Sequence, residues 1–356
     1  MNLHDVFDLM IKENASDAIL KAGSPIRLRI FTELKEQGKA VFSGKEIEAA
    51  IAGLVTPAEK KLVEQRRGYE GAVSHGEAWR FRIGIFWQQG QPAIVARKID
   101  LQTLNFEKLN LPAAVLESLC RERRGLILLV GMAGSGKSTT IASMIEHINQ
   151  NAGRHILTAE EPIEYVFREK MSVINQREIG RDVADYEEAL KQMANLSPDI
   201  LYIGDIRDAG TCSAVLKAAE KGILVFSTLH SVNAQTTVET LINFFPREQQ
   251  DRMFVRLSLL LKGVIAQRLI PRDGAPGLIP AYEVMTLSPT IAAAIAEKRI
   301  VDIPKIIRES SDMFGMNTYE QCLLRLIREN KIAHESALEY SDSRKDIEVS
   351  LTYRRE

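Results

Sequence analysis

Apolar and polar positions follow two different patterns along the chain, and the change falls near residue 100. Before it, apolar residues at helical spacing predict a helix over residues 3–14. Residues 26–30 and 79–85 alternate between apolar and polar positions, as half-buried strands do, and residues 93–99 are expected to pair with the second strand. These patterns predict a mixed α+β unit in the first hundred residues.

Two helices are expected between residues 44 and 66. Ser43 and Glu46 match the capping-box pattern, in which a hydroxyl residue and a later carboxylate satisfy each other's backbone amides. Thr56 and Glu59 match the pattern again, and Pro57 stands at the first helical position, where a missing amide proton costs nothing.

Beyond residue 112, short apolar runs alternate with helical segments, a pattern typical of a largely parallel sheet covered by helices. The strands are expected at Leu126–Val130, Ile156–Thr158, Ile200–Ile203 and Leu224–Ser227. Residues 288–340 are expected to be helical, and the charged stretch 341–356 is expected to be a strand or tail. We therefore predict an α/β protein with an N-terminal domain at 1–99, a linker at 100–112 and a second domain at 113–356.

Composition narrows the classes of function. Lys and Arg number 46 against 47 Asp and Glu, which disfavours nucleic-acid binding because such proteins usually carry a basic excess. Cys120, Cys212 and Cys322 stand singly, so neither a disulfide framework nor a zinc site is expected. No apolar run approaches the roughly 20 residues of a membrane span, and the first residues lack the pattern of a signal peptide. We expect a soluble intracellular protein.

Residues 131–138 fit the phosphate-loop pattern G-x-x-x-x-G-K-[ST], between one predicted strand and a predicted helix at 139–148. Glycines at these positions let successive backbone N–H groups point at a phosphate, at the positive end of the following helix. Lys137 would place a cation against the β- and γ-phosphates, and Ser138 would offer a hydroxyl to Mg²⁺. The sequence therefore predicts a nucleoside triphosphate site.

Three further features suit the same site. Asp205 ends an apolar run, where its carboxylate can hold a magnesium-bound water. Glu160, Glu161 and Glu164 follow another predicted strand, either as the base that activates water or as a solvated acidic turn. His230 ends a third apolar run, either as a sensor or as a hydrogen-bonded structural residue.

Taken together, these motifs resemble those of the secretion-superfamily hexameric ATPases, and specifically the type IV pilus retraction ATPases of the PilT/PilU group. The segments that carry the resemblance are 131–140, 156–165, 176–178, 197–208, 227–231 and 267–269. Residues 15–20 and 22–25 look like the start of the family's small PAS-like domain. The C-terminal half is most similar to the PilU branch, an accessory or second retraction motor.

The resemblance implies a PAS-like N-terminal domain, a RecA-like P-loop ATPase domain with a helical C-terminal region, and a role for each matching residue. Glu164 would be the general base, Asp205 the Walker B acid and His230 the γ-phosphate sensor. Arg82 and Arg97 of the N-terminal domain would complete the site, with Arg80 as the runner-up. Mg²⁺ would be bound by Ser138 and Asp205. The nucleotide contacts would be Gly131, Ala133, Gly134, Ser135, Gly136, Lys137, Ser138 and Thr139.

The resemblance further implies ATP and Mg²⁺ as cofactors, a homohexamer, and a cytoplasmic protein peripheral at the inner membrane through the pilus machine. Its partners would be an inner-membrane pilus platform protein and a paralogous retraction ATPase, with no nucleic acid. Three residues differ from those usual in the family: Asp205 stands where the family usually has Glu, Glu161 where it usually has Asp, and Ile223 where it usually has a second His. Residues 290–295 also lack the sequence signature that is specific to retraction ATPases.

Two other functions remain open at this point. The chain could be a nucleotide-binding accessory subunit with little turnover of its own, which the replacements at 205 and 223 favour slightly. It could also be a pilus-extension or type II secretion assembly ATPase. Chains of that class usually carry an extra N-terminal domain and often a four-cysteine metal insertion. The length of this chain therefore favours a retraction ATPase.

Overall fold

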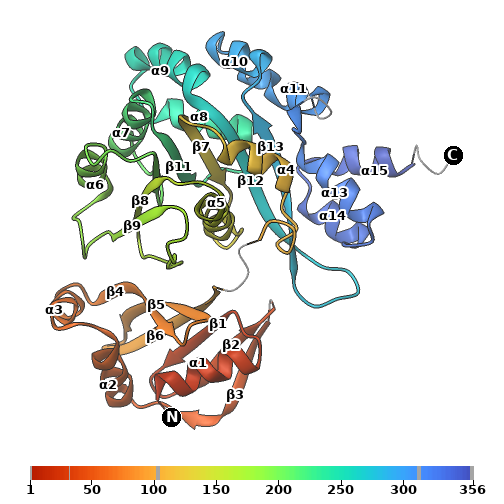
Figure 1. Ribbon diagram of the computed structural model, residues 1–356. Helices are drawn as coiled ribbons and strands as arrows, with labels where there is room; N and C mark the ends of the chain where they lie inside the picture. Colours follow the sequence, from red (N-terminus) through yellow and green to blue (C-terminus); the bar gives the residue numbers. More distant parts are fainter. Residues whose placement is uncertain (1, 32, 102–104, 311–313, 353–356) are drawn as a thin grey trace. The chain divides into compact units, whose positions relative to one another are not determined.

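The computed structural model holds two separate sheets, each of which builds the core of its own unit (Figure 1). The described residues are 2–31, 33–101, 105–310 and 314–352. The smaller unit comprises Met1–Thr103 and Glu161–Val166, and the larger one comprises Leu104–Glu160 and Phe167–Glu356. The α/β fold class is therefore confirmed, whereas the predicted domain boundaries at residues 99 and 113 stay a prediction.

The smaller unit is built on a six-stranded antiparallel sheet in the order β3-β2-β1-β6-β5-β4. Its strands are β1 (Asp17–Lys21), β2 (Pro25–Ile30), β3 (Glu33–Val41), β4 (Gly68–His75), β5 (Trp79–Gln88) and β6 (Gln91–Asp100). Its helices are α1 (Leu3–Lys12), α2 (Gly44–Leu54) and α3 (Pro57–Arg66). The predicted strands at 26–30, 79–85 and 93–99 are confirmed, and the last two pair with each other.

Side-chain alternation explains which face of β5 packs against the core of the smaller unit. Phe81, Ile83 and Ile85 are buried on one face of the sheet, whereas Arg80 and Arg82 are only partly covered on the other. Because successive residues of a strand point to opposite faces, this pattern covers the core while it leaves the arginines accessible.

Capping side chains set the starts of α2 and α3. The Ser43 and Thr56 hydroxyls accept hydrogen bonds from the amides of Glu46 and Glu59, whose carboxylates accept in return from the cap amides. Both predicted capping boxes are thus confirmed. Helix α1 ends before the predicted residue 14, because Asn14 has a φ of 49°, in the left-handed region that no helix interior uses.

The larger unit is built on a seven-stranded sheet in the order β13-β12-β7-β11-β10-β8-β9, parallel except for the antiparallel pair β12–β13. Its strands are β7 (Gly125–Val130), β8 (His155–Glu160), β9 (Val173–Glu178), β10 (Ile200–Ile203), β11 (Leu224–Leu229), β12 (Leu261–Pro271) and β13 (Leu278–Thr286). All four predicted strands of this region are confirmed, as β7, β8, β10 and β11.

Helices cover both faces of this sheet (Figure 1). They are α4 (Ala113–Cys120), α5 (Lys137–Asn151), α6 (Tyr186–Met193), α7 (Ala209–Glu220), α8 (Ala234–Asn243), α9 (Arg247–Leu260), α10 (Pro289–Ala296), the 3-10 turn η1 (Ile300–Asp302), α11 (Ile303–Glu309), α13 (Tyr319–Arg328), α14 (His334–Tyr340) and α15 (Arg344–Thr352). Every residue of β7 is buried, with Leu126, Leu128 and Val130 in one core cluster and Ile127 and Leu129 in the other. The sequence of this strand is therefore a continuous apolar run, as expected for a strand that is buried on both faces.

The expectation of a strand or tail at residues 341–356 was wrong, because residues 344–352 form α15. The amide of Asp346 donates to the Ser343 hydroxyl at 3.3 Å, which caps the first turn. Ile347 is fully buried in one core cluster of the larger unit, and Leu351, one helical turn further on, packs against the same cluster. The Ser343 cap and this apolar pair were the sequence signals for a helix. Residues 353–356 lie outside the described part.

Only α5, with 15 residues, is longer than 14 residues among the described helices. A membrane-spanning helix needs about 20 apolar residues. No helix in the described part of the chain is long and apolar enough to cross a membrane.

The three cysteines lie in the core of the larger unit and are not paired in disulfides. Burial raises the pKa of the Cys120, Cys212 and Cys322 thiols, to about 12 for Cys212. The nucleophilic thiolate form is therefore disfavoured at neutral pH. Across the described residues, no group of three or more His, Cys, Asp or Glu side chains is placed to hold a metal ion.

Candidate functional site

The predicted phosphate loop joins β7 to α5, and its glycines take backbone conformations that other residues avoid. Gly131, Gly134 and Gly136 have φ values of 146°, 79° and 90°. A Cβ atom at Gly131 would lie 2.4 Å from the carbonyl oxygen of Gln267, a distance that real side chains do not tolerate. The loop conformation therefore needs glycine at these positions.

The same loop offers donors for an anion. Gly136 is the N-cap of α5 and provides no side-chain hydrogen bond to the first-turn amides. The Lys137 side chain is buried, and its ammonium donates to the carbonyl oxygens of Gly131 and Met132 at 2.8 and 2.9 Å. Ser135 Oγ is buried without a hydrogen-bond partner among the described residues. The loop therefore fits a phosphate group, which would accept from such donors.

Gln267, at the carboxyl half of β12, supports this loop and was not predicted as a site residue. Its side chain is 2% exposed, and its Oε1 accepts a hydrogen bond from Thr140 Oγ1 at 2.8 Å. Its Nε2 atom would lie 2.6 Å from a Cβ atom placed at Gly136. The signal for it was its place in the resembling segment 267–269, since no spacing rule links residue 267 to residue 131.

Asp205 follows β10, and its carboxylate lies among polar groups from the neighbouring strand end. Asp205 is 5% exposed, and its Oδ1 accepts from Thr228 Oγ1 at 3.2 Å. Its Oδ2 accepts from Arg207 Nε at 2.9 Å and lies 3.6 Å from His230 Nε2. Because β10, β11 and β7 are parallel neighbours, Asp205 and His230 lie at the same sheet edge as the phosphate loop.

Ile223, where the family usually has a second His, lies just before β11, at the end of the strands opposite to the phosphate loop. Its carbonyl oxygen accepts from the Gly125 amide at the start of β7, whereas His230 follows the paired residues Leu229 and Val130 at the strand ends. A strand of this length spans roughly 20 Å. Ile223 is therefore too far from its own subunit's phosphate loop to affect the chemistry there directly.

The predicted acidic cluster is divided between the two units. Glu160, in the larger unit, is buried, and its Oε1 accepts from Thr158 Oγ1 at 2.7 Å and from Gln176 Nε2 at 3.1 Å. Glu164 belongs to the smaller unit, where its Oε1 accepts from Arg82 Nη1 at 3.1 Å. Glu161 is exposed. These three carboxylates therefore have different surroundings, and the sequence alone could not distinguish them.

The three predicted arginines have different partners within the smaller unit. Arg80 donates to the carbonyl oxygen of Ile163 at 2.9 Å, and Arg97 Nε donates to Asp17 at 2.7 Å. Both terminal nitrogens of Arg82 are bound, one to Glu164 and the other to Glu70 at 2.6 Å. Burial lowers the pKa of Arg82, but hydrogen bonds and attraction to the two carboxylates outweigh it and raise that pKa overall.

A buried carboxylate supports the helix that follows His230. Glu283 on β13 is 6% exposed, and its Oε1 accepts from the Ala234 amide at the start of α8 at 2.7 Å. Burial raises the pKa of Glu283 to about 7, and the charges of Glu320 and Asp342 add to this against the opposing effects of the Ala234 bond and Arg268. Because the folded pKa exceeds the ordinary value, the folded protein loses stability as pH rises from about 4.5 to 7.

We expect Glu283→Gln to raise the thermal unfolding midpoint at pH 8 and to change it little at pH 4. The amide oxygen can still accept from Ala234, and the cost of a buried charge is removed, which is worth up to about 3 kcal/mol. Melting curves at both pH values check this. An equal shift at both would show that packing, and not ionisation, governs the site.

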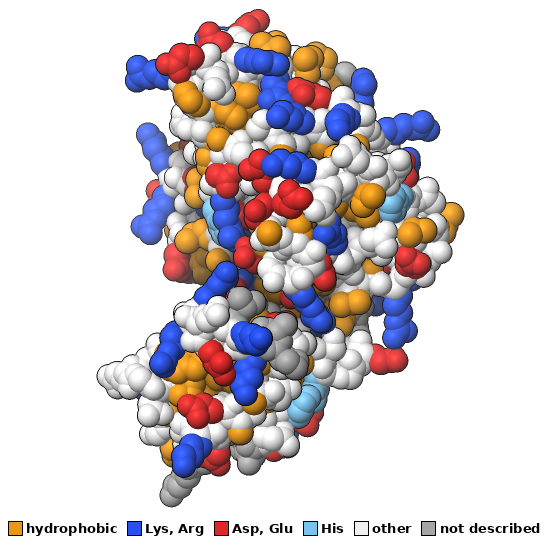
Figure 2. Space-filling view, turned by 90° about the vertical axis from the view of Figure 1, so that its left-hand side faces the viewer, with side chains coloured by type: hydrophobic (Ala, Val, Ile, Leu, Met, Phe, Trp, Pro, Cys, Tyr) orange, Lys and Arg blue, Asp and Glu red, His pale blue; other side chains and the backbone are white. Residues whose placement is uncertain are grey.

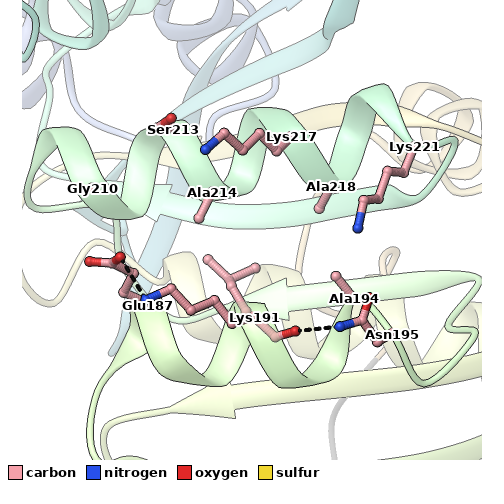
Figure 3. A pocket seen from close by; sticks show the side chains of 11 residues that line it. Glu187, Lys191, Ala194, Asn195, Gly210, Ser213, Ala214, Lys217, Ala218 and Lys221 are labelled. Atoms are coloured by element: carbon pink, nitrogen blue, oxygen red, sulfur yellow. Dashed lines mark hydrogen bonds and ion pairs between the residues drawn. The ribbon is translucent and has the colours of Figure 1, made fainter.

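A separate cavity of about 440 Å³ lies between α6 and α7. Figure 3 shows Lys191 and Asn195 on one side of it and Lys217 and Lys221 on the other. None of the described residues that line it belongs to the phosphate loop. Figure 2 shows basic and acidic side chains interspersed on the visible face of the larger unit.

The chain is similar to known proteins over most of its length. The family described as "Type II/IV secretion system protein" matches residues 4–322. The type IV pilus ATPase PilU of Pseudomonas aeruginosa is 30% identical over 99% of this chain and 91% of its own length. The type IV pilus retraction ATPase PilT of that organism is 33% identical over 95% of this chain and 98% of its own length.

A solved structure agrees with these matches. The pilus retraction motor PilT, crystallised with bound ADP, is 34% identical, with a TM-score of 0.86 over 98% of this chain and 99% of that one. The fold and the sequence match therefore cover both units of the chain. This protein belongs to the type II/IV secretion system protein family.

Proposed function

We propose that this protein is an ATP-hydrolysing motor that drives type IV pilus retraction, and that it works as a PilU-type accessory motor. The observation that carries the proposal is the phosphate loop with Asp205 and His230 at one sheet edge, in a chain similar over nearly its whole length to PilT and PilU. The bound ADP of the PilT structure supports a nucleotide at this loop.

Each residue of the loop has a proposed role. Lys137 binds the β- and γ-phosphates, and Ser138 and Asp205 hold the magnesium ion. When bound, the ion would neutralise charge on the phosphates. The remaining nucleotide contacts are Gly131, Ala133, Gly134, Ser135, Gly136 and Thr139.

Four further residues have proposed roles in the chemical step. Glu164 takes a proton from the attacking water, and His230 senses the γ-phosphate. Arg82 and Arg97 offer positive charge to the nucleotide of a neighbouring subunit, where it offsets the charge that develops in the transition state. This arrangement requires a ring, and we propose a homohexamer.

We expect Arg82→Ala to leave ATP binding intact and to lower turnover by roughly 10- to 100-fold. The substitution removes a cation, and it also removes the 3.1 Å partner of Glu164. Phosphate release and an ATP-binding titration on the same preparation check both parts. Unchanged turnover would remove Arg82 from the site.

The proposed partners follow from the family. The ring acts on an inner-membrane pilus platform protein and cooperates with a paralogous retraction ATPase, and it is cytoplasmic and peripheral at that membrane. An accessory role is favoured by Asp205, since an aspartate carboxylate lies about 1.5 Å further back than that of the usual glutamate.

Steady-state phosphate release with Mg-ATP, together with the native mass in the same buffer, tests the proposal. Turnover by a hexamer supports a motor. A hexamer that binds ATP without releasing phosphate contradicts the motor and shows a nucleotide-binding accessory subunit. Pilus retraction in a strain lacking the gene then tests the cellular role.

A further inference from the structure

A row of charged side chains crosses four neighbouring strands of the smaller unit. The register places Arg29 of β2 opposite Asp17 of β1, Asp17 opposite Arg97 of β6, and Arg97 opposite Arg82 of β5. Directly opposite residues of neighbouring strands share one face of a sheet. One carboxylate therefore lies between arginines on either side, with a third arginine next in the row.

Asp17 is held on both of its carboxylate oxygens. The residue is 5% exposed, and its Oδ1 accepts from Arg97 Nε at 2.7 Å. Its Oδ2 accepts from Ser16 Oγ at 2.8 Å and lies 3.6 Å from Arg29 Nε. A carboxylate this buried and this fully bound has little freedom to move, so its position determines where the Arg97 guanidinium lies.

Arg97 uses only its Nε atom in this contact. Within the described part of the chain, neither terminal nitrogen of Arg97 has a hydrogen-bond or ion-pair partner, and the side chain is 55% exposed. Arg82 differs, because both its terminal nitrogens are bound to carboxylates. Arg97 therefore presents a free pair of N–H₂ groups, the geometry that binds phosphate oxygens in pairs.

We propose that Asp17 is a positioning residue for hydrolysis: it binds Nε of Arg97 and thereby directs the terminal nitrogens toward the γ-phosphate of a neighbouring subunit's nucleotide. The inference rests on the proposed function, in which Arg97 acts between subunits. Without Asp17 the guanidinium would sample many rotamers, and a displacement of about 1 Å at a reacting centre can cost up to 100-fold in rate.

The test measures kcat and KM for phosphate release by the full-length ring. Asp17→Ser removes both carboxylate oxygens and leaves no acceptor within reach of Arg97 Nε, and we expect kcat to fall about tenfold while KM for ATP stays within about twofold. Arg97→Ala is measured alone and together with Asp17→Ser. Because Asp17 acts through Arg97, the double variant should be no slower than Arg97→Ala alone. Losses that multiply in the double variant would overturn the inference.

Controls separate positioning from folding. Arg27→Gln removes one positive charge from the same strand and face as Arg29, in a side chain that is 57% exposed, and should keep native kcat. Native mass and melting temperature are recorded for every variant. If Asp17→Ser does not assemble, Asp17→Ala takes its place, since it also lacks an acceptor that can reach Arg97. Native kcat in an assembled Asp17 variant would overturn the inference.

The outcomes also distinguish this inference from the proposed function. Native kcat in Arg97→Ala would remove Arg97 from the site, and the role of Asp17 would fall with it. A slow Arg97→Ala ring beside a fast Asp17→Ser ring would leave the proposed function standing and refute only the positioning role. A native ring without phosphate release would refute both.

Discussion

Lys137→Ala is expected to reduce ATP turnover by roughly 10³-fold or more, and to weaken ATP binding as well. The Lys137 ammonium is buried and is held by the carbonyl oxygens of Gly131 and Met132, so it already lies inside the loop before a phosphate arrives. Removing it leaves the phosphates without their main protein cation in a site where charges are poorly screened. Phosphate release and an ATP-binding titration measure the two effects.

A lysine elsewhere on the same unit provides the matched control. Lys217 is exposed on α7 beside the cavity of Figure 3, and Lys217→Ala removes the same charge without touching the loop. It should hydrolyse ATP at the native rate. Normal hydrolysis by Lys137→Ala would refute the assignment of residues 131–138 as a phosphate loop.

Glu164→Gln is expected to keep ATP bound while slowing hydrolysis by roughly 100-fold or more. The amide has nearly the shape of the carboxylate, so the nucleotide contacts should survive, but it cannot accept a proton from water. The change also replaces the ion pair with Arg82 by a neutral hydrogen bond. Single-turnover hydrolysis, with bound ATP and ADP quantified separately, distinguishes lost chemistry from lost binding.

Glu160→Gln and Glu161→Gln complete this experiment. Glu160 accepts two hydrogen bonds in the core of the larger unit, and an amide oxygen can accept the same two, so we expect its substitution to slow hydrolysis far less. Hydrolysis at the native rate by Glu164→Gln would show that Glu160 or Glu161 is the base. The slower of the two remaining variants would then identify it.

Local patterns were sufficient for most of the elements. The run Leu126–Val130 predicted β7, and the glycine-rich segment after it predicted the turn into α5, because a phosphate loop depends on glycine conformations and on one helix end. The capping boxes at Ser43 and Thr56 predicted helix starts for the same reason. Such features depend on residues only a few positions apart, so they can be recognised without knowing the rest of the fold.

Contacts between distant residues were not predictable in this way. Gln267 lies far along the chain from Gly131, and it reaches the loop only because β12 pairs with β7. Asp17 meets Arg97 only because β1 pairs with β6, which no spacing in the sequence indicates. The helix α15 was missed because its charged face suggested a solvated tail, whereas burial of Ile347 decides its conformation.

The sequence by itself determined the fold class, the phosphate loop and the family, because each rests on periodicity or on a short run of residue types. Only the tertiary structure decided which side chains meet: Asp205 with His230 at one sheet edge, and Arg97 with Asp17 in one charged row. Strand order brings such residues together, and it depends on packing over the whole sheet. For the same reason the sequence could identify Arg82 and Arg97 as candidates but could not predict their partners. In the structure, Arg82 is bound by two carboxylates, whereas the terminal nitrogens of Arg97 are free among the described residues.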